Sequence, residues 1–310
     1  LAAGDTVVDI GANDGTLLRA YRDPGLVRVG FEPAKNLLAS AREGTTQIFS
    51  DFFSYRLFAE AFGEKRAKVI TAIAMFYDLD DPNAFVADIR RALDPEGLFV
   101  IEMHYLPATL AKNAFDAICH EHLEYYSLFS LSNLLQRHNL EIFDVALNDI
   151  NGGSFRAYVR HRGAHIGRDR AGAGARVAAL QESEKRAGLE SRAVYEDFTK
   201  RVHALRERLA SFIRGETAQG KKVYVYGAST KGNTLLQFFN LDHRLITAPA
   251  ERNPAKRGKK TIPTAIPIVS EAEARSIHEG EELALVDAEG TPRGGLTIRD
   301  RFRRDKRHEA

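Results

Sequence analysis

The chain has 310 residues, enough for about two domains, and its composition of 44% hydrophobic and 28% charged residues is that of an ordinary globular protein. The formal net charge of +2 argues against nucleic acid or a membrane surface as a partner. No apolar run in the sequence is long enough to span a bilayer.

Cys119 is the single cysteine of the chain. A disulfide framework and a cysteine-rich zinc site are therefore excluded, and a cytoplasmic location fits. The chain opens at Leu1 and enters its first predicted strand within a few residues. We therefore expect that a natural N-terminal segment precedes the sequence given.

Strand and helix patterns alternate through the first half of the chain. Apolar runs predict strands, and the segments between them predict helices over residues 16–21, 33–42 and 81–93. The predicted strands cover residues 7–10, 27–31, 47–49, 69–74 and 98–103. Asp94-Pro95-Glu96-Gly97 predicts a turn before the last of them. This alternation favours a doubly wound, Rossmann-like α/β domain with a parallel sheet.

Two further strands are predicted without a full helix between them, over residues 140–145 and 155–159. The turn Asn151-Gly152-Gly153 joins them, so we expect an antiparallel pair at the edge of the same sheet. The first domain is then expected to span residues 1–163.

The second half of the chain has a different pattern. Residues 176–214 are charged and helix-forming, and Gly188 divides them into two predicted helices of a connector, residues 164–219. Strand patterns at 222–226, 245–248 and 266–269, with a helix at 234–239, predict a smaller α/β domain over 220–288. Residues 289–310 are polar and rich in arginine, and we expect a disordered tail.

A glycine turn directly follows the first predicted strand, in Asp9-Ile10-Gly11-Ala12-Asn13-Asp14-Gly15. Its spacing is G-x-x-x-G, whereas a dinucleotide-binding turn requires G-x-G-x-x-G. Gly11 permits close approach by a ligand. Asp9 suits a cationic ligand with an amino group better than a pyrophosphate. The alternative is a purely structural turn.

Acidic residues also end the second and third predicted strands. Glu32 could accept both hydroxyls of a ribose, and Asp51 could accept an adenine amino group while Phe52 covers the ring. Acids at the ends of three successive strands match an adenosine-binding crevice. Over residues 7–106 the chain resembles class I methyltransferases. This resemblance implies S-adenosyl-L-methionine as cofactor, bound by Asp9, Gly11, Asn13, Asp14, Gly15, Glu32, Asp51 and Phe52.

Three later segments, in the same order, resemble the sugar C-methyltransferases of deoxysugar and surface-polysaccharide biosynthesis. They are residues 113–127, which include His120-Glu121-His122, then Asn151-Gly152-Gly153-Ser154-Phe155-Arg156, and residues 226–234. This resemblance extends over residues 6–274. It implies methyl transfer to a ring carbon of a nucleotide-activated keto-deoxysugar, and a C-terminal unit that helps to hold the nucleotide. It also implies an upstream zinc-binding segment, which this sequence does not contain.

A ring carbon becomes a nucleophile only after it loses a proton, which can leave next to a ketone if a base is in reach. The family's base falls on His122, with Glu121 as its polariser or orienter. Cys119 stands where the family often has a tyrosine, so that role is either unfilled or passes to Tyr125 or Tyr126. Some members carry a histidine in the region of Met75, which this chain lacks.

The expected partner is thus a small-molecule nucleotide sugar. The expected catalytic residues are His122, Glu121, His120 and Tyr125. The expected substrate-binding residues are Tyr126, Ser154, Arg156, Ser229, Lys231 and Asn233, with Lys231 and its neighbours at the phosphates.

Other interpretations of these residues stay open. His120 and His122 could be surface residues or bind a metal with His104, but H-E-H is not the H-E-x-x-H pattern, and we expect no metal. Arg156 could pair with a carboxylate, and residues 227–232 could be a plain helix start. The whole chain could also be a non-catalytic binding module, or an NAD-dependent sugar-modifying enzyme, which the glycine spacing disfavours.

Overall fold

The computed structural model describes residues 1–168, 170–276, 282–286 and 292–297. The chain forms two compact units, Leu1–Ala114 with His120–Tyr195, and Phe115–Cys119 with Glu196–Ala310. These boundaries differ from the predicted ones, because the predicted connector is divided between the units within helix α8 (Arg192–Ala218). The short segment Phe115–Cys119 joins the second unit because Phe115 packs there against Phe238 and Phe239.

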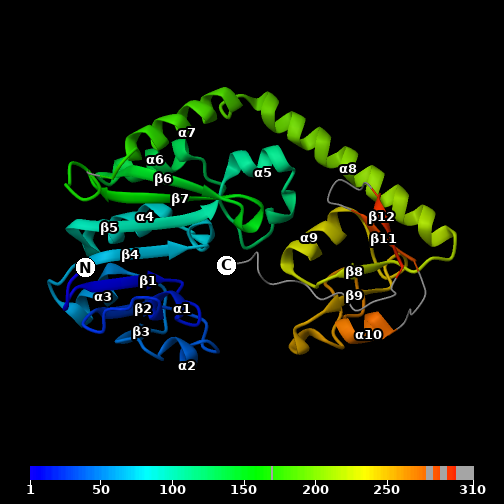
Figure 1. Cartoon of the computed structure of the whole chain (residues 1–310), viewed down its shortest axis with the longest axis horizontal. Helices are drawn as coiled ribbons and strands as arrows, with labels where there is room; N and C mark the ends of the chain where they lie inside the picture. Colours follow the sequence, from blue (N-terminus) through cyan, green and yellow to red (C-terminus); the bar gives the residue numbers. More distant parts are fainter. Residues whose placement is uncertain (169, 277–281, 287–291, 298–310) are drawn as a thin grey trace. The chain divides into compact units, whose positions relative to one another are not determined.

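The first unit is built on a seven-stranded sheet in the order β3-β2-β1-β4-β5-β7-β6 (Figure 1). Strands β1 to β5 are parallel, and β7 is antiparallel to both β5 and β6. The predicted doubly wound sheet, with an antiparallel pair at one edge, is confirmed. The strands are β1 Thr6–Ile10, β2 Val27–Phe31, β3 Gln47–Phe49, β4 Ala67–Ile73, β5 Leu93–His104, β6 Leu140–Asn148 and β7 Ser154–His161.

Helices cover both faces of this sheet because side chains alternate along each strand. On β1, Val8 and Ile10 belong to the main core, which α3, α4, α6 and α7 also supply. Val7 points to the other face and packs with Leu18 of α1 and Ala41 of α2. The helices are α1 Thr16–Arg19, α2 Leu38–Ala41, α3 Tyr55–Phe62, α4 Pro82–Ala92, α5 Leu106–Lys112, α6 Leu128–Arg137 and α7 Ala173–Ala187.

Local details of the first unit differ from the prediction. The expected turn at residues 94–97 is a bulge inside β5, because the partners of β4 pass from Leu93 directly to Leu98. The expected helix over residues 33–42 shortens to α2. Helix α3 was not predicted, and Ser54 begins it by accepting a hydrogen bond from the Leu57 N–H.

The second unit contains a three-stranded parallel sheet in the order β10-β9-β8. Two of the predicted strands lie about three residues later than expected, and α9 begins earlier because Ser229 caps it. The two predicted long helices are confirmed as α7 and α8. The other elements are β8 Tyr224–Tyr226, α9 Thr230–Phe238, β9 Ala248–Glu251, β10 Val269–Ser270, α10 Glu271–Ser276, β11 Glu282–Val286 and β12 Pro292–Thr297.

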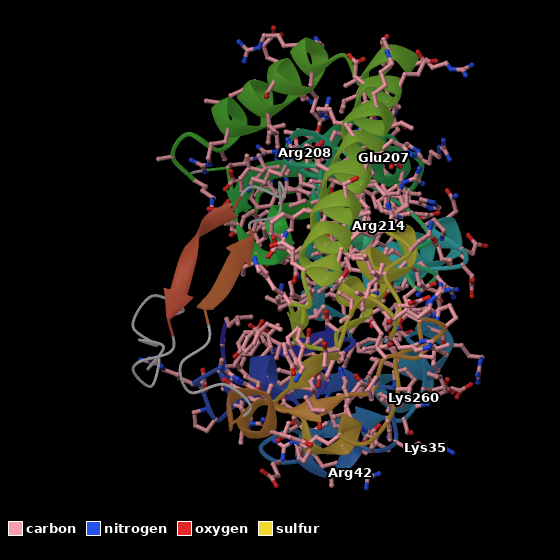
Figure 2. All side chains as sticks on the ribbon, turned by 90° about the vertical axis from the view of Figure 1, so that its right-hand side faces the viewer. Lys35, Arg42, Glu207, Arg208, Arg214 and Lys260 are labelled. Atoms are coloured by element: carbon pink, nitrogen blue, oxygen red, sulfur yellow. The ribbon has the colours of Figure 1, made fainter. Side chains whose placement is uncertain are left out.

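Helix α8 separates apolar from charged side chains. Val202, Leu205 and Ile213 are buried, whereas Glu207, Arg208 and Arg214 are exposed (Figure 2). The charges therefore form the expected solvated face. None of the described helices has the length and apolar character needed to cross a membrane.

The predicted tail of residues 289–310 is described only in part. Strand β12 lies within it and pairs antiparallel with β11. The other residues of that tail lie outside the described part of the chain.

Candidate active site

The order of the sheet places the candidate site at the carboxyl ends of β1 and β4. The chain winds outward in opposite directions from these two neighbouring strands, and open α/β sheets bind ligands at such a point. The glycine turn follows β1, and the short helix η1 (Phe76–Asp78) follows β4.

Glu32 at the end of β2 is held by backbone donors from two segments. The N–H of Asn13 donates to Oε2 at 2.8 Å, and the N–H of Ala34 donates to Oε1 at 2.7 Å. The side chain is thereby fixed beside the glycine turn, and the residue is 6% exposed. Each oxygen retains a lone pair for a further donor, as ribose binding requires.

Asp9 is also buried at the carboxyl end of β1, where the Thr71 hydroxyl donates to its Oδ1 at 2.5 Å. Burial raises the pKa of Asp9 to about 6; the hydrogen bond from Thr71 opposes this, and the negative charge of Glu32 adds to it. A nearby cation would stabilise the ionised form of such a buried carboxyl. Thr71 was not predicted from the sequence, because it is internal to β4.

The two glycines of the turn have backbone conformations that side chains rarely adopt. Gly11 has φ of 72°, and a Cβ there would lie 3.2 Å from Met75 Cγ. Gly15 has φ of 82°, and its Cβ would lie 3.0 Å from the Ala41 carbonyl oxygen. Gly11 thus allows Met75 to lie close to the turn, and Gly15 allows α2 to pack closely against the start of α1.

The remaining predicted cofactor residues lie around this turn and at the end of β3. Asn13 is exposed, and the Asp14 carboxylate accepts from the Thr16 N–H, which stabilises the turn. Hydrogen bonds from the Thr16 hydroxyl and N–H hold the pKa of Asp14 below its usual value. Asp51 is exposed and accepts from the Phe52 N–H, and Phe52 is 74% exposed. The adenine roles of Asp51 and Phe52 stay predictions.

The ring of His122 lies in a group of three ring side chains. Its centroid is 4.4 Å from that of Tyr77 and 5.4 Å from that of His104, which are themselves 5.5 Å apart. Tyr77 belongs to η1 and His104 ends β5, and both are buried, whereas His122 is half-buried. The backbone fixes this arrangement, since the Tyr77 carbonyl accepts from the N–H of Leu123 at 3.0 Å.

Asp78 and Glu121 add negative charge beside His122. Partial burial raises the pKa of Asp78 to about 6; the interaction with His122 opposes this shift, and that with Glu121 adds to it. Tyr77, Asp78 and His104 were not predicted as catalytic residues. The sequence signal that could have identified them is their position at the carboxyl edge of the sheet, since Tyr77 and Asp78 follow β4 and His104 ends β5.

The other predicted catalytic residues are less enclosed. His120 is 84% exposed in its side chain, and its Nε2 lies 3.9 Å from Oε1 of Glu121, which is 58% exposed. Tyr125 is half-buried. Tyr126 is buried, contacts Phe76, and donates its hydroxyl to Glu124.

The segment 151–156 places its polar residues next to β5. Ser154 is buried, is the register partner of His104, and donates to the Ile150 carbonyl at 2.9 Å. Arg156 donates to the buried carboxylate of Glu102 at 2.6 Å. The alternative that Arg156 pairs with a carboxylate is therefore the arrangement found.

In the second unit, three predicted substrate residues lie at the start of α9. Ser229 is the N-cap and accepts from the Gly232 N–H at 3.0 Å. Lys231 and Asn233 are half-buried on the first turns. Oδ1 of Asn233 is buried and has no hydrogen-bond partner among the described residues.

The residues of the first unit fit S-adenosylmethionine. The buried Glu32 carboxylate offers acceptors to ribose hydroxyls, Asp9 offers a negative charge to a cationic group, and Gly11 leaves the space that a Cβ would fill. Among the described residues, no three His, Cys, Asp or Glu side chains come together as a metal site. The sheet order with its reversed β7 is that of the Rossmann-like class I methyltransferase fold.

Comparisons with known proteins agree with this class. A methyltransferase domain model matches residues 1–145, and a C-methyltransferase C-terminal domain model matches residues 149–285. The chain is 33% identical over 276 residues to the C-methyltransferase NovU of Streptomyces niveus, covering 88% of this chain and 64% of that protein. It therefore spans just under two thirds of the length of that curated relative.

Solved methyltransferase structures are also similar to about half of this chain. They include the N-methyltransferase NodS of Bradyrhizobium japonicum, with a TM-score of 0.39 and 13% identity over 51% of this chain and 86% of NodS. The mitomycin 7-O-methyltransferase MmcR has a TM-score of 0.41 and 19% identity over 51% of this chain and 49% of MmcR.

Over most of its length the chain is thus similar to S-adenosylmethionine-dependent methyltransferases, and these similarities imply S-adenosylmethionine as its cofactor. The match to a methyltransferase domain is followed along the chain by the match to a C-methyltransferase C-terminal domain. The resemblance inferred from the sequence is confirmed.

Asp9 gives a pH-dependent prediction for cofactor binding. In the free chain the raised pKa of Asp9 means that folding favours the protonated carboxyl. Protonated Asp9 therefore contributes most to the stability of the fold below the usual pKa of an aspartate, and this contribution is lost as the pH rises through about 6. A bound cation favours the ionised form instead. We expect S-adenosylmethionine binding near pH 5 to release a proton, and binding near pH 8 to release none.

Calorimetry in two buffers of different ionisation enthalpy measures this proton release. The variant Asp9→Asn cannot ionise and should release no proton at either pH, whereas Asp5→Asn, at the half-buried position just before β1, should behave like the parent. Equal proton release from parent and Asp9→Asn would show that another group responds to the cofactor.

Proposed function

We propose that the protein transfers a methyl group from S-adenosylmethionine to a ring carbon of a nucleotide-activated keto-deoxysugar. The observation that carries this proposal is the ring group of His122, Tyr77 and His104 at the carboxyl edge of the sheet that also carries the cofactor residues. The similarity to a C-methyltransferase over 88% of the chain supports carbon as the acceptor atom.

His122 is the base in this proposal. It is half-buried and contacts the Tyr77 ring. Histidine is the side chain that most often serves as a general base in enzymes. It removes the proton from the carbon next to the ketone, and the electron pair of that C–H bond forms the enolate. Asp78 and Glu121 supply negative charge that favours the imidazolium produced.

The cofactor supplies an electrophilic methyl group. The enolate carbon would form the new C–C bond to that methyl as the methyl–sulfonium bond breaks, which would leave S-adenosylhomocysteine and restore the ketone. Glu32 and the Gly11 turn orient the cofactor, and rigid orientation of the two reactants lowers the entropy cost of the reaction. The first turns of α9, with Lys231, bind the phosphates of the nucleotide in this proposal.

A non-catalytic binding module is the rival function. Such a module would need only the residues that bind the cofactor, and a base at His122 would have no role in it. His122 lies against two buried rings, and the Leu123 N–H next to it donates to the Tyr77 carbonyl, an arrangement that favours an enzyme.

The test is a methyl-transfer assay with a panel of nucleotide keto-sugars that differ in nucleotide and sugar. Mass spectrometry should detect one added methyl group on at least one of them, with equal formation of S-adenosylhomocysteine. Sugars in which the ketone has been reduced to an alcohol are the matched controls and should accept nothing, because they cannot form an enolate. Cofactor binding without transfer to any keto-sugar would favour the binding module.

A further inference from the structure

The second unit repeats a hydrogen-bonded motif of the first. In both units a strand runs into a glycine with positive φ, a helix follows, and the next strand ends in a glutamate. The Gly11 N–H donates to the Phe31 carbonyl at 2.9 Å, just before Glu32. The Gly227 N–H donates to the Ala250 carbonyl at 2.7 Å, just before Glu251.

The two glutamates are held in the same way. Glu32 accepts from a backbone N–H of the glycine turn and from that of Ala34, two residues further along. Glu251 accepts from the Ala228 N–H in its own glycine turn at 2.9 Å, and from the Asn253 N–H at 2.9 Å. Each carboxylate therefore joins the end of its strand to the neighbouring turn.

The Glu251 side chain is held in its ionised form, in which both oxygens accept hydrogen bonds. Its side chain is 13% exposed, and Lys256 lies 3.8 Å from Oε2. The N–H groups of Asn253 and Ala228, with the charge of Lys256, hold the pKa of Glu251 below its usual value. One backbone bond to each oxygen leaves lone pairs for further donors.

Glu251 was absent from the residues predicted for the substrate, which all lie on or before α9 in this unit. Phosphates require donors, and the first turns of α9 with Lys231 can supply them. A nucleotide also carries hydroxyl donors on its ribose, for which a carboxylate is the matching acceptor. Within the glycine-turn motif described above, Glu251 is the residue that corresponds to Glu32.

We propose that Glu251 accepts hydrogen bonds from the ribose hydroxyls of the nucleoside in the substrate. This inference rests on the proposed nucleotide-sugar substrate and assigns the residue that recognises its ribose. It makes the second unit a nucleoside-binding counterpart of the cofactor domain, with the phosphates at α9 and the ribose at the end of β9.

The experiment is a double-mutant cycle between the carboxylate and the ribose hydroxyls, measured by calorimetry on the whole chain. ADP, CDP, GDP, UDP and dTDP are first compared, and the tightest binder is paired with its dideoxy counterpart, which lacks the ribose hydroxyls. The parent should prefer the normal nucleotide by roughly 10- to 100-fold, as expected for hydrogen bonds to a charged acceptor. The variant Glu251→Gln should bind the two ligands equally.

Two controls separate this role from a structural one. Glu216→Gln removes another carboxylate of the same unit, which pairs with Lys221 before β8, and should keep the full preference. Glu251→Gln should still bind S-adenosylhomocysteine. Because the comparison of ligands on the parent needs no variant, it stands even if Glu251→Gln folds poorly.

The outcomes are distinct. A parent that binds a nucleotide and its dideoxy counterpart equally, or a folded Glu251→Gln that keeps the preference, would overturn the role of Glu251 and leave the proposed function standing. A parent that binds none of the five diphosphates would overturn the nucleotide-sugar substrate itself, and the role of Glu251 with it.

Discussion

His122→Ala should abolish exchange of the substrate's acidic C–H for deuterium while leaving cofactor binding intact. With S-adenosylhomocysteine in the cofactor site, no methyl group can move, so the exchange reports proton removal alone. Loss of a positioned base typically slows a reaction by roughly 10²- to 10⁴-fold. Heavy-water incubation of a keto-sugar substrate, followed by mass spectrometry, measures the exchange rate.

The matched control is His120→Ala, because His120 lies in the same loop but is 84% exposed in its side chain. This variant should lose much less exchange than His122→Ala. If His122→Ala exchanges deuterium at the rate of the parent, the base lies elsewhere. Tyr77 and His104, whose rings neighbour His122, are then the groups to substitute.

Glu32→Gln should weaken the binding of S-adenosylhomocysteine by roughly 10- to 100-fold. The substitution removes the charge, and it turns an amide group toward the N–H donors of Asn13 and Ala34. A ribose then loses its charged acceptor, and the glycine turn loses one of its own hydrogen bonds. Calorimetric titration measures the affinity, and thermal melting checks that the variant is folded.

Glu43→Gln is the control for this prediction, since Glu43 is exposed beyond α2. Its affinity should equal that of the parent. A folded Glu32→Gln with unchanged affinity would place the ribose of the cofactor away from β2.

The sequence predicted the sheet because its strands are short apolar runs separated by helix-forming segments. It also predicted the polar residues that directly follow β1 and β2, since strand ends show in the pattern. At residues 94–97 the turn-forming sequence Asp-Pro-Glu-Gly predicts a turn. In the structure these residues are a bulge within β5, because Leu93 already pairs with Ala67 of β4. Helix α2, Leu38–Ala41, is shorter than expected.

The surroundings of His122 could not be predicted in the same way. Tyr77, His104 and His122 are separated by long stretches of sequence, and only the order of β4 and β5 in the sheet brings their rings together. The partners of Arg156 and Glu251 likewise depend on register and on backbone donors, which residue types do not reveal. Phe115–Cys119 joined the second unit through aromatic contacts that have no local signal.

The position of the transferred methyl group tests the central claim most directly. S-adenosylmethionine labelled at its methyl carbon is incubated with the parent and the accepting nucleotide keto-sugar, and the product is analysed by nuclear magnetic resonance. Base-catalysed C-methylation predicts a labelled methyl coupled directly to a ring carbon next to the ketone, and no such product from His122→Ala. A labelled methyl bonded to oxygen or nitrogen, or equal C-methylation by His122→Ala, would contradict the account.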